Sequence, residues 1–236
     1  MHYLLTPFGE HFDSGFGAVG DSFKSAADSI LASVGDRHLL DEHLPASFLY
    51  RHASELYLKS GIVILHRVLR LPFGGEPFSG QPYVRIEAGW KRMEEVHSLL
   101  LLFRYWRSLF EEHRTVLATQ SHIDWTCPGE MEGWIGAVEA YDPTSAFYRY
   151  PMTKRRDRDP EKSLNQPSDQ ASIFASMGPG EPYVKAFFVM SEEGEIARAY
   201  EFDDTDAAEK LETLRRVADV LHDFHAAMRG ELTGGW

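Results

Sequence analysis

One long apolar segment, from about Pro45 to Leu69, constrains the fold of this chain more than any other feature. It contains the run ASFLYRHASELYLKSGIVILHRVLR, which is apolar around most of a helical circumference, and Pro72 with the Gly74-Gly75 pair follows it. A helix that is apolar on nearly all sides is stable in water only when other elements cover it. We therefore expect a central, mostly buried helix with other helices packed around it.

Other segments with helical spacing of apolar residues supply the covering helices. This spacing predicts helices over 22–34, 86–117, 130–141 and 206–229. The last of them opens on the capping-box-like series Asp206-Ala-Ala-Glu209 and ends at Gly230. Asp142 before Pro143 is a favourable N-cap for a further short turn. The first 21 residues show no period and are predicted to be an irregular arm.

The composition changes after residue 151. Residues 152–182 contain the run KRRDRDPEKSLNQPSDQ and lack periodicity, so we expect an exposed insertion there. Residues 183–202 consist of two β-prone runs around Ser-Glu-Glu-Gly-Glu, which predicts a β-hairpin. No repeat or linker divides the chain. The sequence therefore predicts one mainly α domain over residues 1–236: a helical bundle with a small β-hairpin insertion near the C-terminus.

Charge and cysteine content exclude several classes of protein. The net charge of −12 excludes a basic protein that coats nucleic acid without specificity. Residues 1–43 sum to −5 and residues 191–212 to −7, whereas residues 44–158 sum to +2, which leaves room for an RNA-binding cleft and for an acidic surface that meets a basic partner. A single Cys127 excludes an internal disulfide framework. With no basic-then-apolar leader and no apolar run of membrane-spanning length, we expect a cytoplasmic protein without membrane contact.

Four polar residues interrupt the apolar central helix: Arg51, His52, Glu55 and Lys59. The steps from Arg51 to Glu55 and from Glu55 to Lys59 are both i,i+4, so these side chains share one side of the helix. Burying unpaired ions costs several kcal/mol each. This side therefore either lines a wet cleft or meets polar groups of another helix, for which His97 and Arg104, seven residues apart, are candidates. A structural ion-pair network and a functional site both fit this spacing.

Three motifs in order give the chain a family resemblance. They are Phe48-Leu-Tyr-Arg-His-Ala-Ser-Glu-Leu-Tyr-Leu-Lys59, then Val96-His-Ser-Leu99, then Tyr141-Asp-Pro-Thr-Ser-Ala-Phe-Tyr-Arg-Tyr-Pro151. This series resembles the HEPN superfamily of compact helical bundles and covers roughly residues 22–151. The resemblance implies a homodimer in many members. In the nuclease branches it implies a metal-independent RNA endonuclease of toxin–antitoxin, anti-phage or RNA-processing systems, restrained by a protein partner or antitoxin.

The chain departs from the nuclease branches at one point. Their Arg, four to six residues before a His, lies late in the bundle, but no His follows Arg149 within that range. If the chain cleaves RNA, His52 or His97 would transfer the proton, Arg51 and Arg149 would stabilise charge on the phosphate, and Glu55 would orient a histidine. These five residues are the catalytic candidates, and no cofactor is expected.

Substrate-binding candidates surround this set. Their side chains could hold phosphates or stack on bases, and they are Lys59, Arg104, Tyr150, Lys154, Arg155 and Arg156. His222 and His225, one turn from Asp219, have a spacing able to share a metal ion. No HExxH motif or Cys pair accompanies them, so an exposed helical segment without metal is the preferred interpretation.

Two interpretations of function remain. The first is a HEPN-type endoribonuclease or RNA-binding effector of a prokaryotic defence system. The second is a non-catalytic HEPN-like module that dimerises or docks onto another effector, with the Arg, His, Glu and Lys side chains paired for structure. The cluster of ionisable residues favours the first, and the missing late Arg–His pair favours the second. An open cleft that gathers His52, His97 and Arg149 would support catalysis, whereas a dry core around them would argue against it.

Overall fold

A computed structural model describes residues 5–32, 41–74, 82–87, 89–177 and 185–235. The chain is mainly helical, with two small antiparallel sheets. Its helices are α1 (Phe16–Ala32), α2 (His43–Leu69), α3 (Leu99–Gln120), α4 (Met131–Tyr141), α5 (Gln170–Ser176) and α6 (Thr205–Thr233), with short 3-10 turns η2 (Phe8–Glu10), η3 (Met93–Glu95) and η4 (Asp159–Lys162). No helix in these described ranges is both long and apolar enough to cross a membrane.

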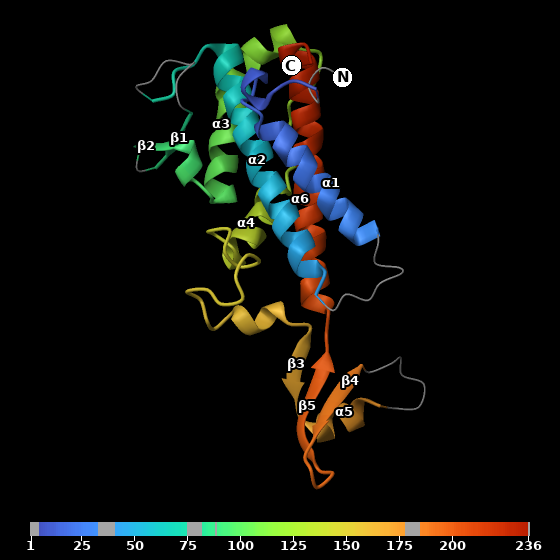
Figure 1. Cartoon of the computed structure of the whole chain (residues 1–236). Helices are drawn as coiled ribbons and strands as arrows, with labels where there is room; N and C mark the ends of the chain where they lie inside the picture. The colour runs from blue at the N-terminus through green and yellow to red at the C-terminus, as the bar shows by residue number, and fades with distance from the viewer. Residues whose placement is uncertain (1–4, 33–40, 75–81, 88, 178–184, 236) are drawn as a thin grey trace.

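Helix α2 forms the centre of the bundle, as the sequence predicts. It packs against α1, α3 and α6, and α4 packs against α3 and α6 (Figure 1). Its consecutive residues Ile62, Val63, Ile64 and Leu65 are all buried. Because consecutive residues of a helix point in different directions, burial of four in a row requires cover on every side. The helix ends at Arg70, which adopts a left-handed conformation with φ of 55°.

Helix α1 begins earlier than predicted, within the segment expected to be an irregular arm. The side chain of Asp13 accepts hydrogen bonds from the backbone amides of Gly15 (3.0 Å) and Gly17 (2.7 Å). These bonds satisfy amides that have no partner inside the first turn of a helix. The helix therefore starts at Phe16 rather than Ser22. Residues 1–4 of the predicted arm lie outside the described residues.

The prediction of one helix over 86–117 is wrong in its first part. Strands β1 (Tyr83–Ile86) and β2 (Gly89–Arg92) pair as a hairpin there, and Gly89 has a φ of +118°, which suits glycine. Helix α3 begins only at Leu99, where the Ser98 hydroxyl accepts a hydrogen bond from the Leu101 amide. His97, two residues before α3, therefore lies in a loop and not on a helix.

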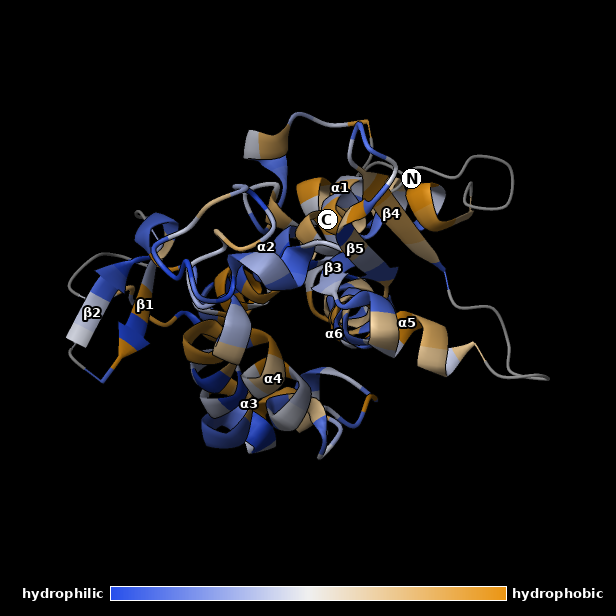
Figure 2. Cartoon of the chain, turned by 90° about the horizontal axis from the view of Figure 1, so that it is seen from below, coloured by the Kyte–Doolittle hydropathy of each residue, from blue (hydrophilic) through white to orange (hydrophobic). Residues whose placement is uncertain are grey.

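A second sheet projects beyond one end of α6 (Figure 1). Strands β4 (Ala186–Met190) and β5 (Ile196–Phe202) confirm the predicted hairpin over its described residues, and β3 (Asn165–Ser168) adds a strand on the other side of β5. The exposed insertion predicted for 152–182 thus contains ordered elements: η4, β3 and α5. Viewed from below, β4 is hydrophobic along its length (Figure 2). We refer to β3, β4, β5 and α5 as the sheet lobe.

The predicted ends of the last helix also need correction. Helix α6 begins after Asp204, without a side-chain capping bond, so the series Asp206 to Glu209 does not form a capping box. The helix continues through Gly230 and ends at Gly234, which has a φ of 67°. A glycine within a helix costs only about 1 kcal/mol, whereas the left-handed position after a helix strongly favours glycine, so the helix stops at the second site.

Candidate functional site

The polar residues of the central helix form a buried ion-pair network with Asp142. Arg51, Glu55 and Lys59 are 0%, 2% and 4% exposed, and Asp142 is 2% exposed. Arg51 Nη1 donates to Glu55 Oε2 at 3.0 Å, and Lys59 Nζ donates to Glu55 Oε1 at 2.7 Å. The i,i+4 spacing therefore places the three side chains together as predicted. The network contains two cations and two carboxylates, so its formal charge balances.

Arg51 joins three separate parts of the chain. Its Nη2 donates to the backbone carbonyl of His97 at 2.6 Å, just before α3, and its Nε lies 3.1 Å from Asp142 Oδ2, just after α4. The other carboxylate oxygen of Asp142 accepts from the amides of Ala146 and Phe147 at 2.8 and 3.0 Å. The predicted N-cap role of Asp142 is thus present in a turn. A direct contact between Arg51 and a phosphate is not compatible with this conformation, because Arg51 is fully buried.

Glu55 is the centre of the network. Burial alone would raise the pKa of its carboxyl group, but the charge and hydrogen bond of Lys59, the charge of Arg51 and the hydrogen bond from His97 outweigh burial and lower that pKa. Glu55 is therefore ionised at neutral pH. An ionised carboxylate with three donors around it is well stabilised, and removal of Arg51 or Lys59 leaves an unbalanced buried charge.

His97 is the exposed member of the group. Its Nδ1 lies 3.0 Å from Glu55 Oε1 and donates to that carboxylate, while half of its side chain is exposed. It borders a shallow depression of about 200 Å³ that Lys91, Pro143 and Thr144 also line. A carboxylate that fixes one ring nitrogen of a histidine leaves the other free for proton transfer. No described residue bonds to the Nε2 of His97.

His52 and Arg149 lie together on a different side of α2. The His52 ring stacks on Phe48 with centroids 5.8 Å apart and meets Phe23 edge-on at 4.6 Å. The guanidinium carbon of Arg149 lies over the Phe48 ring, 5.5 Å from its centroid. Burial, reinforced by the charges of Arg149 and Arg51, lowers the pKa of His52 despite the opposing charge of Glu55. The structure thus pairs Glu55 with His97 and separates His52 from that pair.

The substrate-binding candidates are dispersed. Lys59 belongs to the buried network, and Arg104 pairs with Glu132 at 3.2 Å on the surface of α3. Arg155 donates to the carbonyl of Ala140 at 3.2 Å. The remaining three candidates are exposed: Tyr150, Lys154 and Arg156. These side chains do not line the depression beside His97.

His222 and His225 have different surroundings and different partners. His225 is buried, and its Nδ1 lies 3.0 Å from the Ser60 hydroxyl, which donates to Asp13 at 2.6 Å. His222 is on the surface, 3.2 Å from Asp223. Across the described ranges, no three His, Cys, Asp or Glu side chains are placed to hold a metal ion. The two histidines thus have separate structural partners, and the prediction of an exposed segment is wrong for His225.

Sequence reasoning missed the part that Asp142 plays in the network. Asp142 lies 91 residues from Arg51 in sequence, and its position before Pro143 indicates a turn without indicating an ion pair. A signal was present in the charge count of the central helix, since two cations and one carboxylate buried together require a second carboxylate from elsewhere.

Comparisons with known proteins give no relative for this chain. No family model, curated protein or solved structure matches it.

Proposed function

We propose that this chain is a non-catalytic, HEPN-like helical module that associates with a second copy of itself through the sheet lobe. The observation that carries the proposal is strand β4, which lies at an edge of the sheet and exposes apolar side chains. Phe187, Val189 and Met190 are 47%, 43% and 54% exposed. An edge strand presents unpaired backbone donors and acceptors, and an exposed apolar edge favours pairing with another strand.

Helix α5 packs against only one of the two faces of the sheet in the sheet lobe. On one face Phe188 stacks against Phe174 of α5, with centroids 5.7 Å apart. On the other face Phe187 stacks on Tyr200 of β5 at 4.7 Å, and Val189 lies opposite Arg198. No described helix covers this second face. Apolar surface of this kind on a lobe that projects from the bundle is typical of an association surface.

Charge around β4 favours a second copy as the partner. Lys185 precedes the strand, and the turn after it carries Glu192, Glu193 and Glu195. If two β4 strands pair antiparallel with Val189 on the symmetry axis, Lys185 of each copy lies opposite the acidic turn of the other. Both ends of the pair then place opposite charges together, and like charges are kept apart.

The burial of the ion-pair network supports the non-catalytic part of the proposal. The Arg51 guanidinium contacts Glu55, the carbonyl of His97 before α3 and the carboxylate of Asp142 after α4. These contacts support a structural role for the motif that resembles HEPN proteins. A module of this type would then act through its surfaces. The HEPN-like assignment rests on the order and spacing of the three sequence motifs.

The test is the molar mass in solution, measured by light scattering after size exclusion. We expect a dimer for the native chain and a monomer for Val189→Lys, which places two lysines against each other on the axis. Val116→Lys, at an equally exposed valine on α3, is the matched control and should remain dimeric. A native monomer at high micromolar concentration, or a dimer that survives Val189→Lys, would reject this interface; a monomer that captures a different protein would indicate a heterotypic partner instead.

A metal-independent RNA endonuclease is the second candidate function, favoured by the Glu55–His97 pair and by Lys91 beside it. Labelled tRNA and messenger-like RNA should then be cleaved in the presence of EDTA, and His97→Ala should abolish cleavage. His122→Ala, at an exposed histidine outside the depression, is the matched control. Cleavage that persists in His97→Ala would remove His97 from the mechanism, and absence of cleavage by the native protein would leave this candidate without support.

A further inference from the structure

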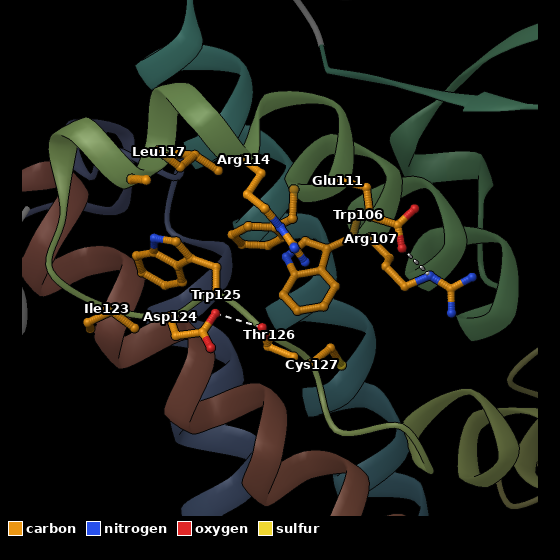
Figure 3. A pocket seen from close by; sticks show the side chains of 12 residues that line it. Trp106, Arg107, Glu111, Arg114, Leu117, Ile123, Asp124, Trp125, Thr126 and Cys127 are labelled. Carbon is orange, nitrogen blue, oxygen red and sulfur yellow. Dashed lines mark hydrogen bonds and ion pairs between the residues drawn. The ribbon is translucent and has the colours of Figure 1, made fainter.

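A second pocket, larger than the depression beside His97, lies where α3 meets the loop that follows it. The helix is distorted at His113, with φ of −115° and ψ of 15°, and after Gln120 the chain folds back along it. Trp125 from the returning loop stacks on Phe110 of α3, with ring centroids 5.6 Å apart. The pocket between them, shown in Figure 3, has a volume of about 340 Å³, which is within the range of small-molecule sites.

The floor of this pocket is aromatic. Trp106, Phe110 and Trp125 contribute rings, and the buried side chain of Leu117 completes the apolar lining. Flat apolar walls of this kind favour a planar ring as ligand, because such a ring covers several aromatic side chains at once. The hydroxyl of Thr126 is already bonded to Asp124 at 2.6 Å, so the loop that carries Trp125 is internally braced.

One cation of the pocket has no carboxylate partner among the described residues. The side chain of Arg114 extends from α3 into the pocket (Figure 3), and no described carboxylate pairs with it. By contrast, Arg107 at the same rim pairs with Glu132 at 2.6 Å and with Glu111 at 3.4 Å. Arg114 is therefore a cation available to a ligand.

The remaining polar groups restrict the chemical class of the ligand further. Glu111 and Asp124 stand at the rim, so a ligand with several negative charges, such as a nucleotide, would be repelled. The thiol of Cys127 also faces the pocket, but burial raises its pKa to about 11, with Arg107 opposing this only in part. The thiol is therefore protonated at neutral pH and unsuited to nucleophilic attack.

We propose that this pocket binds a small planar aromatic carboxylate. Its ring packs against the three aromatic side chains, and its carboxylate pairs with Arg114. The site is independent of the proposed association, because the C-terminal half of α3, which lines the pocket, lies at the opposite end of the bundle from the sheet lobe (Figure 1).

The test uses 6-hydroxy-2-naphthoate as the probe and the tryptophan indole resonances of the ¹⁵N-labelled full chain as the readout. The Trp125 resonance is assigned with Trp125→Phe, which retains a stacked ring. We expect saturable movement of that resonance on titration. Arg114→Gln should weaken binding at least tenfold, and the neutral 6-hydroxy-2-naphthamide should bind the native protein at least tenfold more weakly, because each removes one charge of the pair.

Arg216→Gln, at an exposed arginine on α6, is the matched control and should bind as the native protein does. Arg114 forms no described ion pair, so its substitution leaves the fold intact, which the unchanged amide spectrum of the variant will verify. The proposal is overturned if the Trp125 resonance does not move at millimolar probe. It is equally overturned if Arg114→Gln or the neutral amide leaves the affinity unchanged.

Discussion

Replacement of Glu55 by Gln tests the buried network most directly. The substitution preserves shape and volume and removes one negative charge, so no cavity contributes to the result. In the native protein Glu55 accepts from Arg51, Lys59 and His97. In the variant two buried cations face Asp142 alone, and the new amide NH₂ group meets donors where it needs acceptors.

The expected loss of stability is large. Breaking a buried ion pair by removing one partner costs about 3–5 kcal/mol, which for a chain of this length corresponds to a fall in Tm of about 6–20 °C. Urea unfolding followed by circular dichroism measures the free energy directly. Lys59→Met in addition to Glu55→Gln removes the surplus cation and should recover at least about 1 kcal/mol of the loss.

The difference in the free energy of unfolding between the native protein and Glu55→Gln should also depend on pH. The folded state holds the pKa of Glu55 below its ordinary value of 4.5, so ionisation of this group stabilises the fold above pH 4.5. That contribution is lost as pH falls through the folded pKa. We therefore expect a constant difference from pH 7 to about pH 5 and a smaller one below pH 4.5.

Glu112→Gln is the matched control, because Glu112 is exposed on α3 and its removal should change stability by less than about 0.5 kcal/mol. If Glu55→Gln costs no more than this control, the balanced-charge reasoning is refuted. If the loss of stability in Glu55→Gln does not diminish below pH 4.5, the loss arises from hydrogen-bond geometry and not from the charge of Glu55.

Three further predictions follow from local geometry. Gly17→Ala should destabilise the fold by about 1–3 kcal/mol, because its Cβ would lie 2.1 Å from Cε1 of His225, whereas Gly136→Ala, with nothing within 4 Å, should stabilise helix α4 by up to about 1 kcal/mol; equal effects in urea unfolding would contradict this. At pH 8 the Cys127 thiol should react with a disulfide reagent about 100-fold more slowly than in urea-unfolded protein, since a rise in pKa from 9.0 to about 11 reduces the thiolate fraction by that factor; equal rates would show that the thiol is not shielded. Arg51→Lys should lower Tm nearly as much as Arg51→Met, because an ammonium group cannot span the three acceptors of a guanidinium; a native-like Tm for Arg51→Lys would contradict the geometry.

The accuracy of the sequence predictions follows the length of each element. The start of α2 was predicted within two residues and its end at the correct residue, because its apolar run is long and stops at glycine and proline. The sequence predicts a helix over residues 86–98 because a short hairpin of four-residue strands leaves little periodic signal beside a strong helical one. Strand β3 was missed for the same reason, since Asn165-Gln-Pro-Ser168 has weak strand propensity and is held by its pairing with β5.

The candidate site was predictable only in its local part. The i,i+4 spacing placed Arg51, Glu55 and Lys59 on one side of a helix, and the structure confirms that arrangement. The spacing does not indicate whether this side of the helix is exposed to solvent or buried, because burial depends on segments distant in sequence. His52, adjacent to Arg51, turns to an aromatic stack on another side of α2. One residue along a helix is a rotation of about 100°, so neighbours in sequence are poor candidates for a shared site.

The position of Arg51 also determines which variants can separate structure from catalysis. Arg51 holds the backbone of His97, and Glu55, which Arg51 contacts, holds the His97 ring. Loss of Arg51 would therefore displace His97, and any activity that depends on His97 would fall even though Arg51 never touches a substrate. If the chain cleaves RNA, loss of activity in an Arg51 variant is thus expected whether Arg51 contacts the substrate or only positions His97. His97→Ala removes a half-exposed ring and leaves the contact between Arg51 and the backbone carbonyl in place, so only this variant distinguishes a catalytic histidine from a structural network.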